Sequence, residues 1–112
     1  MKEIKYRQLV GKDWHYWGYI DGFFVGPITN QQPEPINCQY TGLKDANGVE
    51  IYEGDIVEDE EHYVSEIYWD NNNAMFCASD VGSLADLSCC PELYVIGNIH
   101  QNPKLLSNMQ EA

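Results

Sequence analysis

The stretch QYTGLKDANGVEIYEGDIV, residues 39–57, decides the fold. Asn47-Gly48 separates two β-prone segments, Tyr40–Leu43 and Val49–Tyr52, and an Asn-Gly pair between such segments is a strong hairpin signal because it tolerates positive φ. Glu53-Gly54-Asp55 supplies a second turn directly afterwards, which redirects the chain into another strand. The stretch therefore predicts a tight hairpin followed at once by a third strand.

The residues before this stretch predict a β-meander. A first strand is expected from Ile4 to Val10, and the aromatic segment Trp14–Ile20 suits a second. Asp21-Gly22 is another two-residue hairpin signal, and Phe23–Ile28 is the returning strand. Thr29–Asn37 is polar and carries two prolines, so it predicts a loop.

The residues after the stretch alternate between short strands and turns. The acidic cluster Glu58–Glu61 is interpreted as a solvated loop tip. The remaining expected elements are strands at Tyr63–Trp69, Ala74–Ala78 and Leu93–Ile99, a turn at Asp70–Asn73, a helical turn at Ser83–Ser88, and a short helix or turn starting at Asn102-Pro103.

No long segment shows the 3.6-residue period of a helix, so the sequence predicts a mainly β protein with little helix. Residues 1–38 are expected to form an N-terminal β-meander and a proline-containing loop. Residues 39–112 are expected to form a small SH3-like β-barrel with a short C-terminal turn or helix, and the two parts to form one compact unit.

The net charge of the chain narrows the range of binding partners that we expect. The formal net charge is −12, and the ten carboxylates between Asp45 and Asp70 are not interrupted by Lys or Arg. Such a surface repels phosphate, so we expect no direct nucleic-acid binding and no attachment to a membrane. The N-terminus lacks an apolar signal segment, and no apolar run reaches the roughly 20 residues of a membrane span. We therefore expect a cytoplasmic protein with free thiols.

No motif identifies a catalytic, cofactor-binding or metal-binding residue. Cys77, Cys89, Cys90 and His100 are suitable zinc donors, but their spacing differs from that of structural zinc sites. The chain also lacks a Walker loop and a Gly-x-Ser-x-Gly motif. A catalytic triad can still assemble in space, so a small hydrolase stays an alternative. Whether Cys89-Cys90 has a role stays open.

Aromatic residues point to an interface. The second expected strand carries them on each of its faces, because successive side chains alternate. One face should line the core, while the other is covered either by the C-terminal half or by another molecule. The candidate interface residues are Trp14, Tyr16, Trp17, Tyr19, Phe23 and Phe24.

Two blocks carry a family resemblance. Residues 39–57 and the block VIGNIHQNPKLL, residues 95–106, resemble the signature and closing blocks of YopX-like proteins, and residues 3–7 and the aromatic strand are similar too. The resemblance implies a phage or prophage origin and a compact β fold, and it supplies no catalytic residue. The motif residues to which we assign architectural roles are Tyr40, Thr41, Gly42, Leu43, Asp45, Asn47, Gly48, Ile51, Tyr52, Gly54, Asp55, Val57, Ile96, Gly97, Asn98, Ile99, Asn102 and Pro103.

These observations predict a non-enzymatic accessory protein of a phage or prophage that binds a protein partner, whose identity the sequence does not give. The alternative is an acidic nucleic-acid mimic, in which the run 45–70 occupies a DNA-binding groove; the same run can equally be solvated charge. We also predict a homo-oligomer whose interface lies in residues 1–24, away from the acidic run.

Overall fold

Two five-stranded antiparallel sheets make up the protein in the computed structural model, which describes residues 4–30, 34–72, 74–79, 82–83 and 92–106. The N-terminal sheet has the order β3-β2-β1-β4-β5 and the C-terminal sheet the order β10-β6-β7-β8-β9. The strands are β1 (Lys5–Val10), β2 (Asp13–Ile20), β3 (Phe23–Val25), β4 (Ile36–Lys44), β5 (Glu50–Tyr52), β6 (Asp55–Asp59), β7 (Val64–Asp70), β8 (Met75–Ala78), β9 (Gly82–Ser83) and β10 (Leu93–Asn98).

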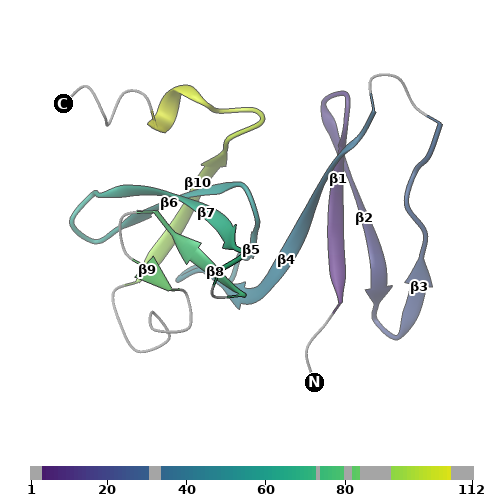
Figure 1. Cartoon of the computed structure of the whole chain (residues 1–112), viewed down its shortest axis with the longest axis horizontal. Helices are drawn as coiled ribbons and strands as arrows, with labels where there is room; N and C mark the ends of the chain where they lie inside the picture. The colour runs from purple at the N-terminus through teal and green to yellow at the C-terminus, as the bar shows by residue number, and fades with distance from the viewer. Residues whose placement is uncertain (1–3, 31–33, 73, 80–81, 84–91, 107–112) are drawn as a thin grey trace.

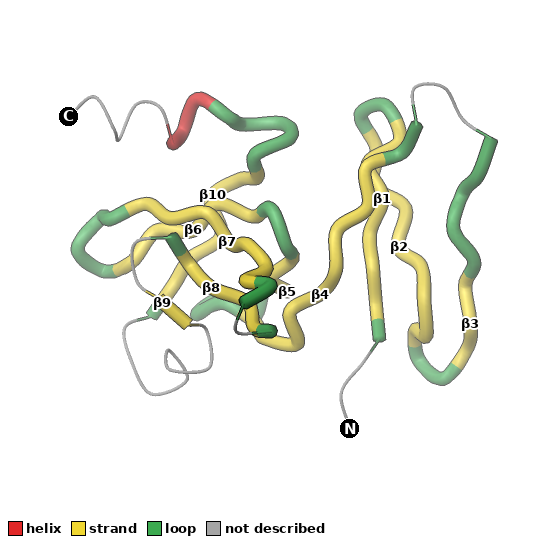
Figure 2. The backbone as a smooth tube through the Cα atoms, in the orientation of Figure 1, coloured by secondary structure: helices red, strands yellow, loops and turns green. Residues whose placement is uncertain are grey.

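Figure 1 shows β1, β2 and β3 at one end of the long axis and β6 to β10 at the other, with β4 running between them. Figure 2 shows that strands dominate and that a short helical segment follows β10; in the described part of the chain it covers residues 104–106. The expected mainly β fold is thus confirmed. No pairing among the described strands closes either sheet on itself, so the SH3-like barrel is not confirmed.

The expected turns form, with one difference in type. Asp21 and Gly22 have φ of 51° and 85°, as a type I′ hairpin requires. At the second hairpin only Gly48 has positive φ, because the turn begins earlier: the Gly48 N–H donates to the Asp45 carbonyl and the Asp45 N–H to the Val49 carbonyl. The Asp45 carboxylate then accepts the N–H groups of Asn47 and Val49, which fixes the loop.

Two expected loops were placed wrongly. Ile36 and Asn37 belong to β4 rather than to a loop, since they pair with Leu9 and Gln8 of β1. Glu58 and Asp59 belong to β6 rather than to a loop tip, because they pair with Tyr94 and Leu93 of β10. In each case a partner strand distant in sequence overrode the local polar signal. The expected helical turn at 83–88 lies outside the described residues, apart from Ser83, which is in β9.

The hydrophobic core lies in two clusters. The larger one joins Ile51 of β5 to side chains of the C-terminal sheet, and its buried members are Ile51, Val57, Ile67, Phe76, Ala78 and Leu93. The smaller one lies where the two sheets meet and contains Cys38, Tyr40 and Tyr52, with Trp14 packed against it. β5 contributes Ile51 to the larger cluster and Tyr52 to the smaller one, so the β4–β5 hairpin joins the two halves of the molecule. Among the described residues, no helix has the length and apolar character needed to span a bilayer.

A buried ion pair crosses the contact between the sheets. The Arg7 guanidinium from β1 donates to the Asp55 carboxylate at the start of β6, and these side chains are 12% and 1% exposed. The guanidinium also lies 4.0 Å from the ring centre of Trp14 and 4.4 Å from that of Tyr52. Lys5 makes a second ion pair within the N-terminal sheet, where its Nζ on β1 lies 2.5 Å from the Glu50 carboxylate on β5. Burial raises the pKa of the Asp55 carboxyl, even though Arg7 and the Tyr52 N–H act to lower it.

Gly54 packs the turn between β5 and β6 against two other segments, β7 and the residues that follow β10. Its φ is +89°, its N–H donates to the Ile67 carbonyl at 2.8 Å, and its carbonyl accepts the Ile99 N–H at 2.9 Å. A Cβ at this position would lie 3.1 Å from Nε2 of His100. The position therefore requires glycine both for its backbone conformation and for its close packing.

Replacing Gly54 with alanine should lower the free energy of unfolding by more than the matched change Gly22→Ala. Gly22 has φ +85°, but a Cβ added there would meet no atom within 4 Å. Gly22→Ala therefore carries only the cost of a left-handed backbone conformation, about 1–2 kcal/mol. Gly54→Ala adds crowding against His100. Urea unfolding of the two variants measures the difference, and equal losses would show that the space at Gly54 is not restrictive.

Candidate functional site

The outer face of the N-terminal sheet carries a row of aromatic side chains. Directly paired residues of neighbouring strands share a face, and the register pairs Tyr6 with Trp17 and Tyr19 with Phe24. The Tyr6 and Trp17 rings stack with centres 4.4 Å apart, and the Tyr19 and Phe24 rings tilt against each other at 5.4 Å. Tyr19 is 57% exposed and Phe24 61%. We call these four residues the outer aromatic surface.

The other expected interface residues lie on the inner face, which meets the C-terminal sheet. Trp14 is half-buried in the junction beneath Arg7, so its ring is used within the chain. Tyr16 is more open and lies 6.0 Å from the Tyr52 ring. Phe23 is 76% exposed at the edge of the sheet. The six candidates therefore divide into a junction residue, a partly covered residue, an edge residue and three members of the outer aromatic surface.

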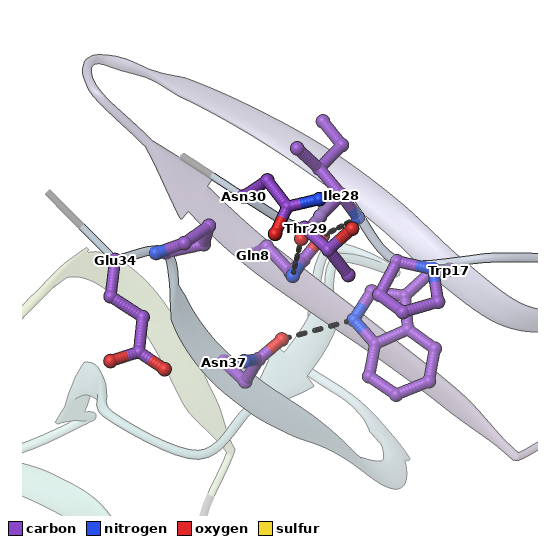
Figure 3. A pocket seen from close by; sticks show the side chains of 9 residues that line it. Gln8, Trp17, Ile28, Thr29, Asn30, Glu34 and Asn37 are labelled. Atoms are coloured by element: carbon purple, nitrogen blue, oxygen red, sulfur yellow. Dashed lines mark hydrogen bonds between the residues drawn. The ribbon is translucent and has the colours of Figure 1, made fainter. Parts of the chain in front are cut away.

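The outer aromatic surface continues into an open pocket of about 560 Å³ (Figure 3). Gln8 holds one wall, because its amide accepts the Ile28 N–H at 2.7 Å and donates to the Ile28 carbonyl at 3.1 Å. Trp17 forms another wall, and its indole N–H donates to Asn37 at 3.2 Å. The described lining residues are Gln8, Trp17, Pro27, Ile28, Thr29, Asn30, Glu34, Pro35 and Asn37.

Charge is distributed very unevenly between the two halves. Residues 1–38 contain four basic and four acidic side chains, whereas residues 39–112 contain two basic and fourteen acidic ones. The whole net charge therefore belongs to the second half, and the outer aromatic surface lies on the neutral half. This separation allows apolar contacts at the N-terminal sheet without bringing the acidic half close to a partner.

At least half of the carboxylates in the acidic run 45–70 serve internal bonds. Glu50 and Asp55 pair with Lys5 and Arg7, while the carboxylates of Asp45, Asp59 and Asp70 accept N–H groups from their own turns. A carboxylate that is committed to a turn or an ion pair is not free to mimic a phosphate. These bonds weaken the case for the nucleic-acid mimic.

A second, smaller cavity of about 200 Å³ lies at the junction and contains a thiol and an imidazole. Cys38 Sγ lies 3.6 Å from His100 Nε2, although the two residues are 62 positions apart. Glu53 and Glu66 line the same cavity. No local spacing joins Cys38 to His100, so their contact could not be predicted from the sequence.

The charge states of this pair do not favour nucleophilic chemistry. Burial raises the pKa of the Cys38 thiol to about 11, and Cys38 is 2% exposed. Burial and the nearby Arg7 guanidinium lower the pKa of His100. Both groups are therefore neutral near pH 7, whereas a nucleophilic cysteine acts as its thiolate. Among the described residues no three Cys, His, Asp or Glu side chains are placed to hold a metal ion.

Several motif side chains bond to the backbone of neighbouring segments. Thr41 donates to the Ile51 carbonyl at 2.8 Å, and Asp45 accepts the Val95 N–H at 2.9 Å. Asn98 accepts the N–H groups of His100 and Gln101 after β10. These polar residues hold β4, β5 and β10 together. Arg7 and Gln8 also make structural bonds, but they were not identified from the sequence because their partners are distant in it.

Acidification should destabilise the protein partly through His100. The pKa of His100 is lowered in the folded state, so below its ordinary value of about 6.5 the unfolded chain binds more protons. The stability that neutral His100 contributes is therefore fully present above about pH 6.5 and is lost as the pH falls below it. We expect His100→Gln to lose less unfolding free energy than the wild type between pH 7.5 and 5.5. Parallel curves for the two proteins in urea would contradict this.

Comparison with known proteins agrees with this architecture. A search of curated proteins finds no match. Among solved structures, the chain is similar to the crystal structure of protein EF1440 from Enterococcus faecalis, with 25% identity, a TM-score of 0.62, and coverage of 95% of this chain and 99% of the other. The family model described as YopX protein matches residues 5–107, which includes both sheets and the junction between them. The chain therefore belongs to the YopX protein family.

Proposed function

We propose that this protein is a non-enzymatic accessory protein of a phage or prophage, that it acts in the bacterial cytoplasm, and that it binds another protein through the outer aromatic surface. The phage or prophage origin is what the family implies. The observation that carries the binding proposal is the pair Tyr19 and Phe24, two large apolar side chains that are more than half exposed on a sheet face. Such patches on a folded domain are typical of interaction sites.

The surface is well suited to a protein partner. Its rings are held by mutual contacts and by the sheet beneath them, so little side-chain freedom is lost on binding. Tyr and Trp combine an apolar ring with a polar group, and they are enriched in the energetically important parts of interfaces. The neighbouring pocket, with Trp17 on one side and Asn37 beside it, gives room for one side chain of the partner.

The chemistry of the junction cavity supports a role without catalysis. Its thiol is protonated and buried, and its imidazole contacts that thiol. Tyr19 and Phe24 are, in contrast, accessible without any movement of the chain. Binding at the N-terminal sheet is therefore the function that the geometry supports best.

Capture experiments with matched variants test the proposal. The tagged protein is expressed in infected or induced cells, and bound proteins are identified by mass spectrometry. The variant Tyr19→Ser removes a ring that is 57% exposed on the outer aromatic surface, and the control Tyr63→Ser removes one that is 59% exposed in the other half. We expect a partner that both the wild type and Tyr63→Ser retain and that Tyr19→Ser loses at least tenfold, a change of about 1.4 kcal/mol.

Two results would contradict this proposal. One is a partner retained equally by all three proteins, which would place binding elsewhere. The other is turnover of a metabolite by the purified wild type that is abolished by Cys38→Ser, which would make the junction cavity an active site.

A further inference from the structure

We propose that two copies of the chain pair through β3, edge to edge and antiparallel, so that the two N-terminal sheets form one continuous sheet around a two-fold axis. β3 is the outermost strand in the order β3-β2-β1-β4-β5. An edge strand presents unpaired backbone groups that can template another strand. This pairing goes beyond the binding of a different protein proposed above, because it concerns the edge of the sheet rather than its outer face.

The register shows which backbone groups are available. Ile20 and Phe23 close the two-residue turn at Asp21-Gly22, so they form a hydrogen-bonded pair. Hydrogen-bonded and non-hydrogen-bonded pairs alternate along an antiparallel ladder, so the next pair, Tyr19 with Phe24, is non-hydrogen-bonded. The N–H and C=O of Phe24 therefore point away from β2, toward a strand added at the edge.

The side chains of β3 are apolar throughout. Phe23 is 76% exposed, Phe24 61% and Val25 36%. The strand has neither Lys nor Pro, which are among the devices that keep edge strands from pairing. Burial of such rings between two copies would remove apolar area from water at roughly 25 cal/mol per Å².

Symmetry specifies how two copies would meet. With Phe24 on the two-fold axis, Phe24 lies opposite Phe24 of the second copy, and Phe23 lies opposite Val25 of the second copy. Phe24 and Tyr19 share the outer face, so the outer aromatic surfaces of the two copies would join into one. Phe23 and Val25 would pack together on the inner face.

The charge distribution favours the approach of a second copy at this edge, because the acidic halves then stay apart. β3 lies at the end of the long axis opposite the C-terminal sheet, and the molecule extends 41 Å along that axis (Figure 1). Pairing through β3 therefore keeps the two acidic halves at the far ends of the dimer. Screening acts over about 8 Å at physiological salt and about 30 Å at 0.01 M. Repulsion should thus weaken the dimer only at low salt.

Sedimentation velocity and cross-linking test this pairing. In a background with Cys89 and Cys90 replaced by serine, Phe24→Cys should cross-link to itself with a short bifunctional maleimide. Tyr63→Cys, at a side chain of similar exposure in the acidic half, should not. The unmodified protein should sediment as a dimer at 0.15 M salt and dissociate partly at 0.01 M.

The variant Phe23→Lys separates this proposal from the proposed function. It places two charges at the dimer edge but leaves the outer aromatic surface unchanged, so we expect a monomer that still captures the partner. An unfolding midpoint equal to that of the wild type shows that the variant folds. A wild type that is monomeric at both salt concentrations, a Phe23→Lys dimer, or equal cross-linking of Phe24→Cys and Tyr63→Cys would overturn the pairing without affecting the capture result.

Discussion

The ion pair between Arg7 and Asp55 is the constraint on which the arrangement of the two sheets depends. A buried charge is costly unless it is paired, so each of these residues requires the other. Asp55 also accepts the Tyr52 N–H at 2.7 Å, which connects the pair to the turn at Gly54. The rings of Trp14 and Tyr52 lie against the guanidinium and exclude water from it. One contact thereby fixes β1, β5 and β6 relative to one another.

This junction also explains how a short chain covers part of its aromatic strand. β2 has aromatic side chains on both faces, and the C-terminal sheet covers one of them at Trp14. The opposite face keeps the outer aromatic surface, where rings contact each other but no second layer of the described chain covers Tyr19 and Phe24. The same strand therefore serves stability on its inner face and is available for binding on its outer face.

Local signals in the sequence were enough to predict most of the strands and turns but not how the sheets meet. Asp21-Gly22 and the motif around Asn47-Gly48 act within a few residues, so they were recognisable directly. Arg7 and Asp55 are 48 positions apart and Cys38 and His100 are 62 apart, and no spacing rule connects such pairs. Glu58 and Asp59 were assigned to a loop because their charge was visible in the sequence, while their pairing with β10 was not.

A double-mutant cycle on Arg7 and Asp55 tests the account most directly. Arg7→Met keeps the long side chain without its charge, and Asp55→Asn keeps an acceptor for the Tyr52 N–H. Unfolding free energies of the wild type, both single variants and the double variant in urea at pH 7 give the coupling energy. If the pair holds the sheets together, the coupling should be about 2 kcal/mol, with each single change costing about 3 kcal/mol or more. Additive effects, with a coupling within about 0.5 kcal/mol of zero, would contradict this account of the fold.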